Sequence, residues 1–136
     1  MIKKNLSKII SVVIMSIIVL GPASIVNAKT VNTDFGTMTY SLTKSNNSSN
    51  YKKAVAKTSM PSDSKVFSYI KTTLEIQKNS TGSKLLEGNA MDTYNKGKTT
   101  NAKVESKYYD VTELAAFSCH EVVGKGSHEE YLAEVF

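Results

Sequence analysis

The sequence predicts an all-β fold, a small antiparallel β-sandwich or barrel of about five to six strands. Three observations support this prediction. Segments with β-branched and aromatic residues alternate with period two, turn residues recur at short intervals, and almost no segment has a helical period. The sequence contains no internal repeat of fixed period. We therefore expect one secreted β domain, residues 29–136, behind a cleaved signal peptide, residues 1–28.

The clearest strand signal lies near the start of this domain. In GTMTYSLT, residues 36–43, the apolar side chains of Met38, Tyr40 and Leu42 alternate with threonine and serine, as in a half-buried strand. The neighbouring segments are expected to be a loose lead at 29–35, a polar loop at 44–50 and a short strand at 51–58.

The longest strand signal is KVFSYIKTTLEIQ, residues 65–77. Val66, Ile70, Leu74 and Ile76 share one parity, which predicts a long strand with one buried face. A helix is the alternative, because Val66, Ile70 and Leu74 are also spaced four residues apart. The threonines and aromatic residues of the segment favour the strand.

The second half of the domain continues the alternation with turns between. In chain order we expect a turn at 79–83, an irregular or edge element at 85–98, and strands at 99–109, 110–123 and 128–136. At the start of 110–123, Asp110 or Thr112 could cap a short helix instead. The glycines of GKGS, residues 124–127, predict a turn that makes the last two strands a hairpin.

The first 28 residues have the order of a secretory signal peptide. Lysines at 3, 4 and 8 precede an apolar run at 9–20, a Gly-Pro break and a small residue, Ala28, at the expected cleavage site. A membrane anchor is the alternative, but a run this short spans about 18 Å as a helix, less than the ~30 Å of a bilayer core. No lipid or cell-wall attachment signal accompanies it. We therefore expect a freely released, extracellular protein without an integral membrane segment after cleavage.

Charge and composition exclude some classes of partner. The chain has 17 basic and 12 acidic residues, and removal of the three leader lysines leaves 14 against 12, a net charge of +2. It contains no arginine, the residue best suited to bidentate phosphate and guanine contacts, so we expect no nucleic-acid partner. A composition rich in Lys, Asn and Ser is typical of an AT-rich Gram-positive bacterium.

The segment 116–131 combines the single cysteine, Cys119, with both histidines. Consecutive strand residues point to opposite faces, so Cys119 and the adjacent His120 are expected on different sides of the sheet. Because Cys119 shares its parity with Phe117 and Val123, we expect it in the apolar core and His120 in solvent. The alternative for the unpaired thiol is an intermolecular bridge. Thiol catalysis is disfavoured, since it requires an imidazole within hydrogen-bond reach.

A metal site is the second hypothesis for this hairpin. With a three-residue turn at 124–126, His120 and His128 lie on one face as diagonal neighbours, and Glu130 lies opposite His120. Two imidazoles and a carboxylate suit Zn²⁺ or Cu²⁺. With a two-residue turn, the pairing shifts by one and the histidines separate. The sequence does not choose between these registers, and two solvent-facing histidines are the simpler interpretation.

A third candidate is a binding surface centred on Tyr69, with Phe67 and Lys71 on the same parity. Exposed aromatic and hydroxyl side chains on a β face are typical of sugar- and protein-binding surfaces. The acidic residues of the last strands suggest a glycosidase pair, but a domain of this size offers little room for a deep cleft.

These observations predict a secreted, non-catalytic β-sandwich that binds the cell envelope, a carbohydrate or a protein partner, without a cofactor. The alternative function is a bacteriocin-like or membrane-active toxin, since small exported β proteins can oligomerise on membranes. A small metal-assisted hydrolase that uses His120 and His128 is the third possibility.

Overall fold

The computed structural model describes residues 27–48, 51–109 and 113–136. These residues form eight strands: β1 (Asn27–Thr33), β2 (Gly36–Ser48), β3 (Tyr51–Met60), β4 (Tyr69–Lys78), β5 (Lys84–Thr93), β6 (Thr100–Tyr108), β7 (Leu114–Val123) and β8 (Ser127–Val135). In the described part of the chain there is no helix, so the helical alternatives for 65–77 and for the described part of 110–123 are wrong.

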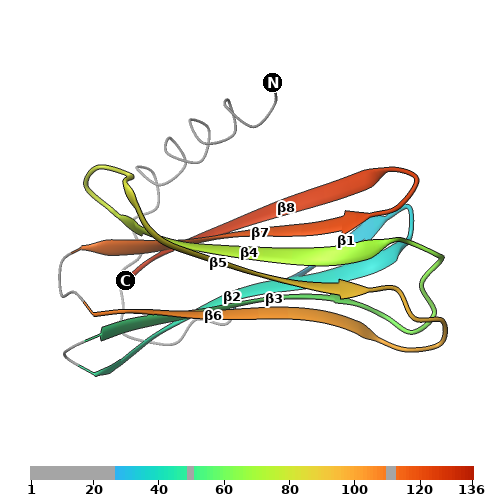
Figure 1. Ribbon diagram of the computed structural model, residues 1–136, viewed down its shortest axis with the longest axis horizontal. Helices are drawn as coiled ribbons and strands as arrows, with labels where there is room; N and C mark the ends of the chain where they lie inside the picture. The colour runs from blue at the N-terminus through green and yellow to red at the C-terminus, as the bar shows by residue number, and fades with distance from the viewer. Residues whose placement is uncertain (1–26, 49–50, 110–112) are drawn as a thin grey trace.

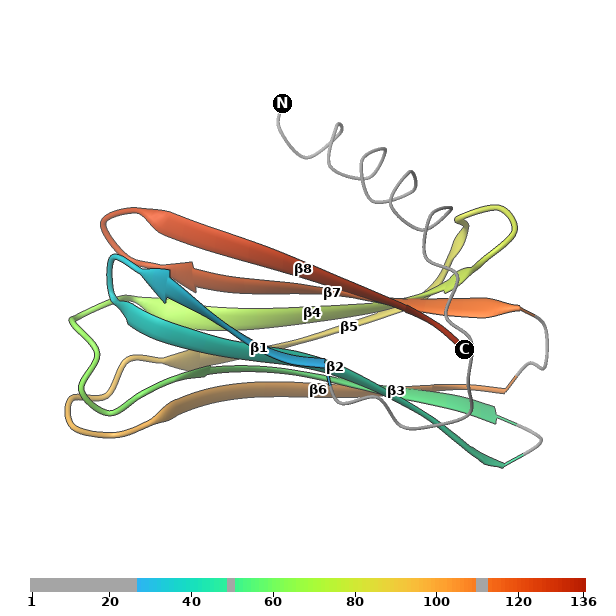
Figure 2. The same cartoon turned by 180° about the vertical axis from the view of Figure 1, so that it is seen from behind.

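The strands form two antiparallel sheets that pack face to face (Figures 1 and 2). Sheet A has the order β1-β2-β3-β6, and sheet B has the order β5-β4-β7-β8. Within the sandwich, β6 lies against β5 and β4, and β2 lies against β7 and β8. The predicted β-sandwich is confirmed, but the prediction of five to six strands is wrong because the structure has eight.

Two strands with few buried side chains, β1 and β5, account for the difference in strand number. β1 occupies the expected loose lead, and it pairs along its whole length with β2. β5 occupies the segment expected to be irregular or an edge element; it is an edge strand of sheet B, and none of its residues is fully buried. β2 also continues through the expected polar loop as far as Ser48. β1 and β5 bury few side chains, so apolar alternation does not reveal them, whereas the edge strands β6 and β8 alternate and were predicted.

The core lies between the two sheets and is built from the inward-facing residues at alternate positions along the strands. From β4, the side chains of Ile70, Leu74 and Ile76 are completely buried. Burial of each such side chain stabilises the fold by roughly 1.5–3 kcal/mol. The other large, fully buried apolar residues are Met38, Leu42, Met60, Leu114 and Val122.

The hairpin turn between β7 and β8 packs against an aromatic pair at one end of the sandwich. A Cβ atom on Gly124 would lie 2.5 Å from Cε1 of Phe35 and 3.3 Å from Cα of Phe67. A Cβ atom on Gly126 would meet nothing within 4 Å. Neither glycine has a positive φ. The two positions therefore differ in packing and not in backbone conformation.

Replacing Gly124 by alanine is therefore expected to lower the free energy of unfolding by about 1–3 kcal/mol, the usual effect of overpacking. Gly126→Ala is the matched control and should change it by less than about 0.5 kcal/mol. Urea denaturation of both variants provides the measurement. Equal stability of the two variants would show that the turn does not pack on Phe35.

The predicted signal peptide lies outside the described residues except for Asn27 and Ala28, which pair with Leu42 and Ser41. Cleavage after Ala28 would leave Lys29–Thr33 of β1 paired with β2. Among the described residues, we find no helix of the length and apolar character needed to cross a membrane.

Candidate functional site

The β7–β8 hairpin has the three-residue turn. Val123 pairs with Ser127, Val122 with His128, and His120 with Glu130, so residues 124–126 form the connection. The Gly124 N–H donates to the Gly126 carbonyl at 2.8 Å and closes the turn. Of the two registers that the sequence left open, the structure has the one that places both histidines on the same face.

That face is the core face, so the predicted orientation of β7 is wrong. His120 is completely buried, whereas Cys119 lies half-buried on the outer face of sheet B. Strand alternation is present as predicted. The assignment of faces fails because Ala115 and Phe117 form a second apolar cluster with Ala133 and Val135, separate from the main core. Apolar side chains therefore line both faces of β7, and parity alone does not identify the inner one.

His120 lies at the centre of a buried polar cluster that joins the sheets. Its Nδ1 lies 2.8 Å from Oγ1 of Thr58 on β3, and its Nε2 lies 2.7 Å from Oγ of Ser118. Thr58 Oγ1 lies 2.6 Å from Oγ1 of Thr72 on β4, which donates to the Ala102 carbonyl of β6 at 2.8 Å. We call Thr58, Thr72, Ser118 and His120 the buried polar cluster.

The hydrogen-bond directions in this cluster follow from the number of protons. A hydroxyl has one hydrogen, and that of Thr72 goes to a carbonyl, which can only accept. Thr58 must therefore donate to Thr72 and accept from Nδ1–H of His120. In a neutral imidazole the other nitrogen then accepts, so Ser118 donates to Nε2. Both ring nitrogens are used, and the neutral ring satisfies the cluster completely.

Burial keeps this imidazole uncharged. Desolvation lowers the pKa of His120 from 6.5 to about 4, although the charge of Glu130 and a backbone group of Lys57 partly oppose the shift. The centre of the Tyr40 ring lies 5.3 Å from the centre of the imidazole ring, and the two planes are inclined at 46°. At neutral pH His120 is therefore a structural hydrogen-bonding group, with neither a charge nor a free nitrogen for a ligand.

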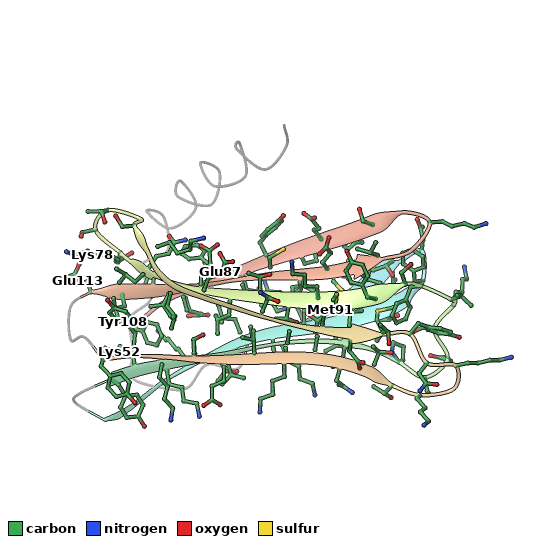
Figure 3. All side chains as sticks on the ribbon, in the orientation of Figure 1. Lys52, Lys78, Glu87, Met91, Tyr108 and Glu113 are labelled. Atoms are coloured by element: carbon green, nitrogen blue, oxygen red, sulfur yellow. The ribbon has the colours of Figure 1, made fainter. Side chains whose placement is uncertain are left out.

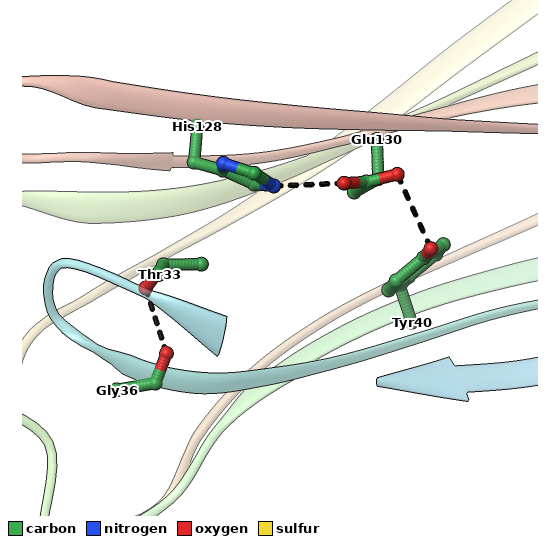
Figure 4. Close-up of polar contacts among 5 residues, drawn as sticks. All are labelled: Thr33, Gly36, Tyr40, His128 and Glu130. Atoms are coloured by element: carbon green, nitrogen blue, oxygen red, sulfur yellow. Dashed lines mark hydrogen bonds and ion pairs between the residues drawn. The ribbon is translucent and has the colours of Figure 1, made fainter. Parts of the chain in front are cut away.

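Glu130 connects His128 to Tyr40 beside the buried polar cluster (Figure 4). One carboxylate oxygen lies 2.8 Å from Nε2 of His128, and the other accepts from the Tyr40 hydroxyl at 3.2 Å. Burial and the adjacent negative charge raise the pKa of the Tyr40 phenol. The structure therefore brings together two of the three predicted metal ligands, His128 and Glu130.

The third predicted ligand, His120, has both nitrogens engaged in hydrogen bonds to hydroxyls. Within residues 27–48, 51–109 and 113–136, no group of three or more His, Cys, Asp or Glu side chains is arranged to hold a metal ion. The geometry therefore gives no support to metal-assisted hydrolysis at this hairpin.

The Cys119 thiol lies on the opposite face of β7 from the His120 imidazole, and it is poorly ionised. The sheet separates its side chain from that of His120, because adjacent residues of β7 point to opposite faces. Burial raises the pKa of the thiol to about 11, and the charge of Glu129 adds to the shift. Reactive cysteines show the opposite shift. Nearby, the Tyr131 hydroxyl donates to Glu129 at 2.5 Å.

The predicted surface of Tyr69, Phe67 and Lys71 is wrong in one residue. Phe67 is buried, with its ring 5.0 Å from that of Tyr94 and 6.3 Å from that of Phe35. The reason is that β4 begins only at Tyr69, so the alternation does not extend back to 65–68. Val66, expected in the core, is 74% exposed for the same reason. Tyr69 and Lys71 are half-buried.

The outer face of sheet A carries a second surface that the sequence interpretation missed. Lys57 pairs directly with Lys103, and Lys53 with Lys107, in the register between β3 and β6. At the end of these rows the rings of Tyr51 and Tyr109 lie 5.7 Å apart, and Tyr109 is 75% exposed. We call these six residues the lysine–tyrosine face. The pattern YKKAVAK contains part of it, but the partner strand was needed to bring the rows together.

A scan of protein-family models finds no match to this chain, and searches of curated proteins and of solved structures find none either.

Proposed function

We propose that this is a secreted, non-catalytic binding protein that attaches through the outer face of sheet A to the cell envelope. The observation that carries the proposal is the lysine–tyrosine face. It combines an exposed aromatic ring with cationic side chains on one sheet face, so that a polar polymer can stack on the ring and pair its charges with the lysines. Secretion rests on the leader-like sequence of residues 1–28.

The rest of the outer face of sheet A is also polar. Thr30, Asn32, Thr37 and Thr39 of β1 and β2 are exposed, and the Thr37 hydroxyl donates to the Asn32 side chain at 3.0 Å. Hydroxyl and amide groups on an exposed sheet provide hydrogen-bond donors and acceptors for a hydrated ligand. In contrast, the histidines of the β7–β8 hairpin face the core side and have protein partners. The exposed sheet face is therefore the better candidate for function.

Cosedimentation with purified envelope fragments tests the proposal. The protein is expected to pellet with the fragments, and Tyr109→Ala should weaken retention by about tenfold, the equivalent of ~1.4 kcal/mol of aromatic contact. The matched control is Tyr131→Ala, which removes a tyrosine from the outer face of sheet B. It should leave retention unchanged.

No retention of the wild-type protein by envelope fragments would reject the proposal, as would equal losses in the two tyrosine variants. Release of dye from liposomes by the wild-type protein would instead support the membrane-active toxin, because a simple binder leaves vesicles intact.

A further inference from the structure

We infer that the ligand of the lysine–tyrosine face is a linear anionic glycopolymer, whose charged groups contact the lysines of β3 and β6 and whose sugar units stack on Tyr109. The inference rests on the proposed function and names the chemical class of its ligand. Three features support it: the charge of the two outer faces, the register between β3 and β6, and the position of the Tyr51–Tyr109 pair.

Lysines are paired with lysines across β3 and β6. Lys57 lies directly opposite Lys103, and Lys53 directly opposite Lys107. Like charges at directly opposed positions destabilise an antiparallel pair. One acid lies among them, Glu105, which forms an ion pair with Lys53 at 3.1 Å. Four positive charges and one negative charge thus share this surface, and a bound polyanion would remove the repulsion between them.

The outer face of sheet B has the opposite balance of charge. The outer face of sheet B carries four glutamates and two lysines. The glutamates are Glu75, Glu87, Glu121 and Glu129, and the lysines are Lys71 and Lys84. One of those lysines, Lys84, already contacts Glu87 at 2.6 Å. The two outer faces therefore have opposite signs, although the net charge of the domain is small. A polyanion would be attracted to sheet A and repelled by sheet B.

The lysines of this face lie in rows along the strands. Lys103 and Lys107 lie four residues apart on β6, which corresponds to about 13 Å along a strand. Nitrogen-tipped side chains project from this face, away from sheet B, in Figure 3. The row ends at the Tyr51–Tyr109 pair, where the Lys107 ammonium lies 5.5 Å from the centre of the Tyr51 ring. Charge contacts followed by an aromatic ring suit an extended chain that carries both anions and sugars.

The test measures binding of the full domain to three defined polymers at low salt: polygalacturonate, inorganic polyphosphate and neutral dextran. Polygalacturonate and polyphosphate should bind and dextran should not, and the affinity should fall as salt increases. The double variant Lys103→Gln/Lys107→Gln should weaken both interactions about tenfold. Tyr109→Ala should weaken binding of polygalacturonate alone.

The matched control is Lys71→Gln/Lys84→Gln, which removes the same charge from the opposite face and should change affinity less than about twofold. Removal of the opposed lysines should also leave the melting temperature equal or higher. Equal losses in both double variants would overturn the inference. So would tighter binding to anionic phospholipid vesicles than to the polymers. Retention by envelope fragments without binding to either polyanion would overturn the ligand class and leave the proposed function intact.

Discussion

Replacing His120 by alanine is expected to lower the free energy of unfolding by about 3–5 kcal/mol, the range for removal of a large buried ring. The imidazole is completely buried, so its loss leaves a cavity between the sheets. It also removes the acceptor for Ser118 and the donor to Thr58, which are themselves buried. Each unsatisfied buried group costs about 1–3 kcal/mol.

The control for this experiment is His128→Ala. His128 lies on the same face of the hairpin but its side chain is 34% exposed, and it contacts one carboxylate. Its loss should lower the free energy of unfolding by less than about 1 kcal/mol. Urea denaturation of the two variants measures both losses, and m-values equal to that of the wild type show that only stability has changed. A loss below about 1 kcal/mol for His120→Ala would show that the buried polar cluster does not hold the sheets together.

Acid is expected to destabilise the protein through the same residue. The unfolded state takes up a proton at His120 near pH 6.5, whereas the folded state does so only near pH 4. Because the unfolded state binds more protons between these values, the free energy of unfolding falls as the pH falls from about 6.5 to about 4. A shift of this size corresponds to about 3 kcal/mol.

The contribution of His120 can be separated from that of the carboxylates. Glu87 has a pKa lowered mainly by its hydrogen bond with Lys84, so its stabilising effect is lost at lower pH, as it becomes protonated. In His120→Gln, which cannot be protonated, the loss of stability between pH 6.5 and 4 should be smaller than in the wild type. Identical pH profiles for the two proteins would contradict a buried neutral imidazole.

The sequence predicted those strands in which every second side chain is buried. The alternation of Met38, Tyr40 and Leu42 identified β2 because these side chains face the core. β1 was missed, and β5 was expected only as an irregular or edge element, because these two strands bury few side chains and are held mainly by backbone pairing. The number of strands therefore depended on contacts that leave no apolar pattern.

The candidate sites were harder to predict because they depend on which strands are neighbours. His120 was predicted to face solvent because its imidazole is polar. In the structure, Thr58, Thr72 and Ser118 give it a polar environment inside the core. Those hydroxyls come from three strands, and a single strand pattern cannot show that they meet. The lysine rows likewise required the β3–β6 pairing, which joins segments separated by two strands of the other sheet.

The buried polar cluster has a consequence for how one layer aligns with the other. Small side chains, among them Ala54, Ala56, Ala102 and Ala116, contribute to the core between the layers beside large ones such as Leu74. Apolar burial is favourable but has no directional preference of its own. Directional bonds from Thr58 to His120 and from Thr72 to the Ala102 carbonyl do not tolerate sliding. The hydrogen bonds of the imidazole thus favour one alignment of the two sheets over others.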